Sequence, residues 1–96
     1  MKHEMILYIN GRVISVFGYD TYTHLITRFD CDGGVTRVDA IVEPSDLGAV
    51  WYSQRSLENG EDAGYIKTGY AETVNKAITD AAENLSHARA VSKGGN

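Results

Sequence analysis

The residues best suited to chemistry in this sequence are aromatic rings placed beside basic groups. Six Tyr and one Trp outnumber the two Phe, so most of the large rings carry a polar group. Two clusters follow each other in the chain: Trp51, Tyr52 and Arg55, and then Tyr65, Lys67 and Tyr70. A ring can stack on a planar ligand while Arg or Lys contacts its phosphate, as in nucleotide and single-strand binding. The clusters therefore favour an anion-binding site; the alternative is that Trp51 anchors the core and the Tyr rings cover its rim.

A second candidate for anion binding is a pair of arginines in a predicted hairpin. Its strands are expected from Thr23 to Asp30 and from Val35 to Val42, joined by the turn residues 31–34. The expected register pairs Phe29 with Thr36, Thr27 with Val38, Leu25 with Ala40, and Arg28 with Arg37. Two adjacent guanidinium groups could hold a phosphate or a carboxylate. The alternative is a charge checkerboard, in which the diagonal carboxylates of Asp30 and Asp39 neutralise the two arginines.

No catalytic or metal-binding motif is found in the sequence. It lacks a Gly-x-Ser-x-Gly elbow, a phosphate loop ending in Lys-Ser/Thr, and a Gly-x-Gly-x-x-Gly turn. The three histidines, His3, His24 and His87, have no neighbours at metal-ligand spacing. The carboxylates on both sides of Cys31 disfavour its thiolate, so we do not expect a nucleophile there. We therefore expect no enzymatic activity, no metal and no cofactor; a small enzyme built from scattered carboxylates is the remaining alternative.

Composition predicts one small globular domain over residues 1–96. The chain has a net charge of −4 and 43% apolar residues, and its charges are spread evenly. Because nucleic-acid affinity comes largely from phosphate neutralisation, this charge disfavours a long nucleic acid as the partner. No apolar run approaches the ~20 residues that span a bilayer. The single cysteine excludes an internal disulfide framework and favours a reducing, cytoplasmic setting.

The clearest structural signal is a hairpin around Asn10-Gly11, because this dipeptide suits the two positive φ angles of a type I′ turn. The two-residue loop pairs Ile9 with Arg12, Tyr8 with Val13, and Leu7 with Ile14. One face of the hairpin then carries Met5, Leu7, Ile9, Ile14 and Val16, and the other carries Ile6, Tyr8, Val13 and Phe17. Both faces are apolar, so we expect each to be covered, one by the rest of the sheet and the other by a helix or a second subunit.

The second half of the chain, residues 45–91, is expected to be mainly helical, after a β-rich part at residues 1–44. Pro44 is expected to end the preceding strand, and Leu47, Val50, Trp51, Gln54 and Leu57 then recur at helical spacing. The alternative is a strand through Val50-Trp51-Tyr52 with a return strand at Tyr65-Ile66-Lys67. A final helix is predicted from about Tyr70 to Val91, followed by a disordered tail at residues 92–96. Its apolar stripe consists of Val74, Ala77, Ile78, Ala81, Leu85 and Ala88.

Residues 11–47 resemble the SH3-like small barrels of the Tudor and KOW kind. The residues that carry the resemblance are the opening strand Gly-Arg-Val-Ile-Ser-Val-Phe, the strand Leu-Ile-Thr-Arg-Phe-Asp, the Asp-Gly-Gly turn and the closing Pro-Ser-Asp-Leu. In such barrels, loop aromatics can line a ligand cage. The resemblance implies that Tyr19 and Tyr22 would take this role here.

The sequence therefore predicts an α+β fold. We expect an antiparallel, strongly curved sheet or a small SH3-like barrel of about four to five strands, followed by one or two C-terminal helices. The expected function is non-catalytic binding of a small anionic, nucleotide-like ligand in a homo-oligomer. The candidate ligand-binding residues are Tyr19, Tyr22, Arg28, Arg37, Trp51, Tyr52, Arg55, Tyr65 and Lys67. The alternative is a protein–protein inhibitor or adaptor, such as a phage-type accessory protein acting on a host complex.

Overall fold

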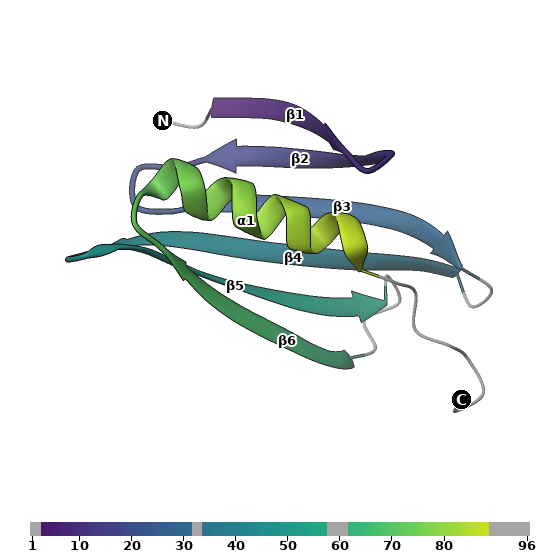
Figure 1. Cartoon of the computed structure of the whole chain (residues 1–96). Coiled ribbons are helices and arrows are strands. Elements are labelled where there is room, and N and C mark those ends of the chain that lie inside the picture. Colours follow the sequence, from purple (N-terminus) through teal and green to yellow (C-terminus); the bar gives the residue numbers. More distant parts are fainter. Residues whose placement is uncertain (1–2, 32–33, 58–61, 89–96) are drawn as a thin grey trace.

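Six antiparallel strands and one helix form the fold (Figure 1). The computed structural model describes residues 3–31, 34–57 and 62–88, with the side chains of 29–36, 55–57 and 62–66 outside the description. The strands are β1 (His3–Ile9), β2 (Arg12–Gly18), β3 (Thr23–Cys31), β4 (Gly34–Ser45), β5 (Gly48–Leu57) and β6 (Asp62–Ala71). Each pairs with the next in the order β1-β2-β3-β4-β5-β6, and the helix α1 (Val74–His87) lies across one face.

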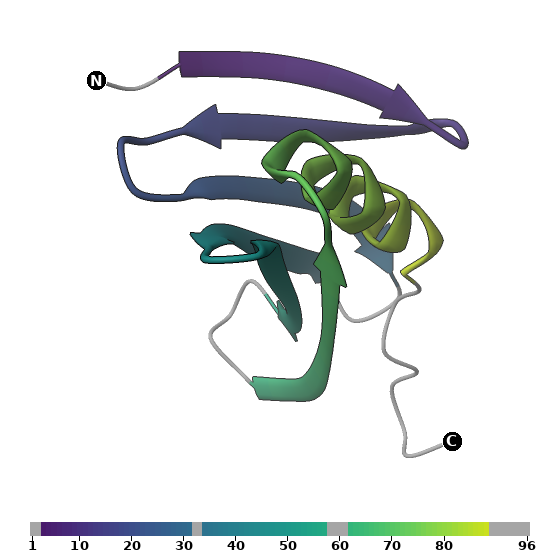
Figure 2. The same ribbon diagram turned by 60° about the vertical axis from the view of Figure 1, so that its left-hand side comes forward.

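The predicted α+β class and antiparallel sheet are confirmed, but the barrel and the number of strands are not. The sheet has six strands rather than four or five, and in the described part of the chain it is not closed, since β1 and β6 form its two edges. The sheet twists around α1, which lies in its concavity (Figure 2). In a closed barrel the first and last strands pair with each other. Here, within the described residues, β1 and β6 do not pair, and the helix packs inside the curve of the open sheet (Figure 2).

Both predicted hairpins are confirmed, including their registers. In the first, Ile9 pairs with Arg12 and Leu7 with Ile14, and the turn residues Asn10 and Gly11 have φ angles of 53° and 77°. These positive angles are those of the expected type I′ turn. In the second hairpin, the pairs Phe29–Thr36, Thr27–Val38, Leu25–Ala40 and Arg28–Arg37 all form.

The helix predicted over residues 46–58 is wrong, because residues 48–57 of this segment form the strand β5. Its side chains alternate: Trp51 and Ser53 are buried, whereas Val50 and Tyr52 are exposed. Helical spacing placed the same apolar residues on one helix face, but pairing of β5 with both β4 and β6 satisfies the backbone and buries Trp51. The return strand of the alternative reading lies within β6.

Pro44 does not end β4, which continues to Ser45 and turns through residues 46–47 into β5. The pairing of β3 with β4 ends at Thr23 and Val42. No residue of β3 therefore lies opposite Pro44 to accept a hydrogen bond from a backbone N–H at this position. Proline is tolerated at such a position because no ladder hydrogen bond is lost.

The C-terminal helix begins at Val74 rather than Tyr70, because Tyr70 and Ala71 complete β6. Thr73 is its N-cap, and the Thr73 hydroxyl accepts a hydrogen bond from the Lys76 amide at 3.1 Å. The predicted stripe faces the sheet: Ala77, Ala81 and Leu85 are fully buried, and Val74, Ile78 and Ala88 pack beside them. Small alanines let the helix approach the sheet closely. The predicted tail at residues 92–96 lies outside the described residues.

The first hairpin holds the end of α1 in place. The Arg12 guanidinium donates to the carbonyls of Leu85 and Ala88, at 2.9 and 2.6 Å, and the Asn10 amide donates to the Ser86 hydroxyl at 2.8 Å. Burial lowers the pKa of Arg12 from its ordinary value. These contacts fix β1 and β2 relative to the helix. In the described part of the chain, the helix is neither long nor apolar enough to cross a membrane.

Candidate functional site

The sheet has a covered face under α1 and an open face on the opposite side. Alternation along the strands places Ile14, Leu25, Val38 and Trp51 on the covered face, where each is buried. The large exposed side chains of the open face are Ile6, Tyr8, Val13, Val50, Tyr52 and Tyr70. Tyr8 is 76% exposed and Ile6 58%. Among the described residues, α1 covers one of the two apolar faces of the first hairpin, and Ile6 and Tyr8 on the other face are exposed.

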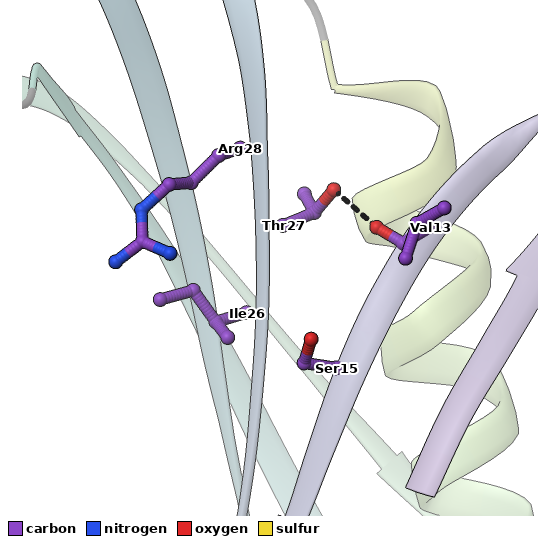
Figure 3. A pocket seen from close by; sticks show the side chains of 5 residues that line it. All are labelled: Val13, Ser15, Ile26, Thr27 and Arg28. Atoms are coloured by element: carbon purple, nitrogen blue, oxygen red, sulfur yellow. Dashed lines mark hydrogen bonds between the residues drawn. The ribbon is translucent and has the colours of Figure 1, made fainter.

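A pocket opens where β2 and β3 diverge. Their ladder runs from Gly18–Thr23 to Ser15–Ile26 and then ends. Beyond that point the Thr27 hydroxyl donates to the Val13 carbonyl at 2.8 Å, in the place of a backbone bond (Figure 3). The resulting pocket has a volume of about 200 Å³ and is lined by Val13, Ser15, Ile26, Thr27 and Arg28.

The lining of this pocket suits a small anion. Arg28 is the one charged residue among the five, Ser15 adds a hydroxyl, and Val13 and Ile26 provide apolar walls. In Figure 3, Ile26 and Arg28 project from the same side of β3. One water takes about 30 Å³ of liquid volume, so the space equals roughly seven waters. The pocket is open to solvent on one side, so it would hold a phosphate or a carboxylate with a few carbon atoms and leave most of a nucleotide outside.

Beside the pocket, an ionic cluster occupies the middle of the open face. The Arg37 guanidinium donates to both carboxylate oxygens of Asp39, at 2.7 and 2.8 Å, and the His24 ring lies 2.7 Å from the same carboxylate. Burial raises the pKa of Asp39, but the hydrogen bonds and charges of Arg37 and His24 outweigh it, so the pKa is lowered overall.

The ionic cluster bears on whether Arg28 and Arg37 together bind an anion or are neutralised by neighbouring carboxylates. They are directly opposite, as predicted. Arg37 is neutralised by Asp39, its neighbour two residues along β4. Arg28 is among the residues that line the pocket between β2 and β3. The side chain of Asp30, the other expected diagonal partner, lies outside the described residues.

Trp51 belongs to a different region, between the sheet and α1. It is 6% exposed and packs over Gly69, its partner across β5 and β6. Within the described part of the chain, its buried indole N–H has no hydrogen-bond partner. A pocket of about 250 Å³ beside it is lined by Trp51, Lys67, Asp80, Glu83, Asn84 and His87. Two carboxylates, Asp80 and Glu83, line this pocket together with Lys67, so its lining favours an anion less than that of the Arg28 pocket.

The structure distributes the predicted site residues over separate regions. Arg28, Arg37 and Tyr52 lie on the open face, and Trp51 and Lys67 line the pocket at the helix.

None of the remaining predicted residues lines either of the two pockets described above. Tyr19 and Tyr22 stack on each other between β2 and β3, with centroids 4.8 Å apart, so no ligand fits between them as a cage would require. Arg55 and Tyr65 are paired across β5 and β6, but their side chains lie outside the described residues.

Four residues of the Arg28 pocket were not singled out in the sequence: Val13, Ser15, Ile26 and Thr27. These residues come together because of the way β2 and β3 pair. A sequence pattern within one strand does not show where that strand stops pairing with its neighbour. Ser15 gave a partial signal, as the one polar residue between Val13 and Phe17.

Comparison of the chain with protein-family models, with curated proteins and with solved structures finds no match.

Proposed function

We propose that the protein is a non-catalytic binding protein that holds a small anionic ligand on the open face of its sheet. The observation that carries this proposal is the position of Arg28 in the pocket between β2 and β3. A guanidinium presents several N–H donors in one plane, which matches the oxygens of a phosphate or carboxylate. The apolar walls and the surrounding strands reduce competition from water.

The surroundings of the pocket support a ligand with a planar group next to its anionic end. Val13, which lines the pocket, is paired across the first hairpin with Tyr8. The Tyr8 ring is 76% exposed on the same face. A phosphate in the pocket would place an attached ring system over Tyr8, where it could stack. This arrangement accommodates a nucleotide whose phosphate is enclosed and whose base is not.

The experiment is a binding titration with inorganic phosphate, AMP and ADP, monitored by thermal unfolding and by calorimetry. We expect Arg28→Gln to weaken binding by about 10- to 100-fold, because hydrogen bonds to charged groups contribute about 1.5–3 kcal/mol. Lys67→Gln removes the same charge on the other side of the sheet and is the matched control; its effect should be less than about 3-fold.

Two results would count against the proposal. One is a wild-type protein that none of these ligands stabilises at millimolar concentration. The other is an equal loss of affinity in Arg28→Gln and Lys67→Gln, which would mean that the ligand responds to overall charge rather than to the pocket.

A protein–protein inhibitor or adaptor is the second candidate, and the aromatic side chains of the open face favour it. Tyr52 and Tyr70 are 41% and 52% exposed, and tyrosine is enriched at protein interfaces. This candidate predicts a partner whose stoichiometric binding is lost in Tyr52→Ala and is unaffected by Arg28→Gln. We also propose a homo-oligomer, because Ile6 and Tyr8 are exposed on the first hairpin.

A further inference from the structure

We propose that a second copy of this chain adds to the free edge of β1, so that the two sheets become one continuous antiparallel sheet. The residues that line the pocket between β2 and β3 belong to those two strands and lie outside this contact, whereas Tyr8 of β1 takes part in both proposals. The edge of β1 would then be the interface of the proposed homo-oligomer.

The backbone of β1 is the first reason. In the described sheet, β1 has β2 as its one neighbour. Ile9 and Arg12 flank the two-residue turn and form its hydrogen-bonded pair, so by alternation Leu7 and Met5 also bond toward β2. The N–H and C=O groups of Ile6 and Tyr8 therefore point outward, away from β2. They form the template on which another extended strand can pair.

The charged residue of β1, Glu4, lies near its start, and the residues after it do nothing to block such pairing. Edge strands are commonly protected by a charge, a proline or a bulge, and Met5-Ile6-Leu7-Tyr8-Ile9 contains none of these. Met5 is 51% exposed on the covered side of the sheet, and Ile6 and Tyr8 are exposed on the open face. The opposite edge, β6, carries Lys67 and an irregular register against β5 at Arg55/Ser56. One edge is thus protected and the other is not.

The sequence of β1 is complementary to itself, which is why we infer a second copy rather than another strand. In an antiparallel pair centred on Leu7, each Leu7 meets its own copy, Ile6 meets Tyr8 of the second copy, and Met5 meets Ile9. Every pair is apolar, and aromatic–aliphatic pairs are favourable across strands. Glu4 meets the neutral Asn10, so no like charges are opposed.

The register centred on Ile6, one position along β1, is less favourable. Centring the pair on Ile6 would place Glu4 against Tyr8 and His3 against Ile9, and so set polar groups against apolar ones. The twofold axis of the Leu7-centred pair stands perpendicular to the sheet, which keeps both α1 helices on the same side. Met5 then packs beside Ile9 of the second copy on that side of the sheet, and Ile6 beside Tyr8 of the second copy on the other.

The size of the contact sets its expected strength. A seven-residue strand is about 24 Å long at ~3.4 Å per residue. A single strand pair of this length is smaller than the interface of a permanent dimer. We therefore expect a dimer that dissociates on dilution through the micromolar range.

The test measures the molar mass of the full chain as a function of concentration, by light scattering and native mass spectrometry. Ile6→Pro removes an outward N–H without touching the β1–β2 ladder, and proline is accepted at edge strands. We expect it to be folded and monomeric at concentrations where the wild type is dimeric. Ile6→Val keeps the N–H and the apolar side chain, and it should remain dimeric.

Tyr8→Lys is the second variant, in case Ile6→Pro does not fold. It leaves the backbone unchanged at an exposed position and places a charge opposite Ile6 of the second copy, so it should also be monomeric. A wild type that is monomeric up to millimolar concentration overturns the inference, as does a folded Ile6→Pro or Tyr8→Lys that stays dimeric. Arg28→Gln should dimerise normally, so failure of the ligand proposal and failure of this one are distinguishable.

Discussion

Replacing Gly69 by alanine tests how tightly Trp51 is packed against the sheet. A Cβ at position 69 would lie closer than 3.0 Å to three atoms of the indole ring. Since real Cβ contacts are not that short, the ring or the strand would have to move. Trp51 is 6% exposed and lies among core residues, so it has little room to do so.

The magnitude follows from two opposing effects. Overpacking a close-packed core costs about 1–3 kcal/mol. Replacing glycine by alanine reduces the freedom of the unfolded chain and returns about 0.4–1 kcal/mol. We expect a net loss of about 1–2 kcal/mol, which for a domain of this size lowers Tm by about 4–16 °C, at ~4–8 °C per kcal/mol.

The assay is urea unfolding followed by fluorescence, because the chain has one tryptophan and its emission reports directly on the affected ring. Gly18→Ala is the matched control: Gly18 is also in a strand, and an added Cβ would meet its nearest neighbour, His3, at an ordinary 3.8 Å. We expect this variant to be neutral or slightly stabilised. A Gly69→Ala protein with wild-type stability and unchanged emission would refute the packing of Trp51 over Gly69.

Two further predictions concern residues next to the Arg28 pocket. Thr27→Val preserves the shape of a side chain that is 2% exposed but removes the donor to the Val13 carbonyl. We expect a loss of about 1–2 kcal/mol in urea unfolding, and a difference within about 0.5 kcal/mol would contradict the role of this bond. Asp39→Asn tests the ionic cluster. Because the folded pKa of Asp39 lies below its ordinary 3.8, the stability it contributes is present above that pH and is lost as the pH falls through the folded value. The gap in unfolding free energy between wild type and Asp39→Asn should therefore narrow in acid; an equal gap at pH 7 and in strong acid would contradict the assignment.

The sequence by itself determined the local structure of this protein. The turn at Asn10-Gly11 and the alternation around it defined the first hairpin, and the second hairpin placed Arg28 opposite Arg37. The stripe from Val74 to Ala88 defined the helix face that packs on the sheet. In each case the deciding interactions connect residues close in the chain, so their spacing alone carries the information.

Tertiary structure decided what depends on distant partners. Residues 48–57 fit both a helix and a strand by spacing, and pairing with β4 and β6 made them a strand. The sheet stayed open because α1 occupies its concave side (Figure 2). The Arg28 pocket exists because β2 and β3 part after Ser15 and Ile26, where the Thr27 side chain replaces a backbone bond. Such a point of divergence is set by the balance of packing across the whole sheet, and no short pattern in the chain encodes it.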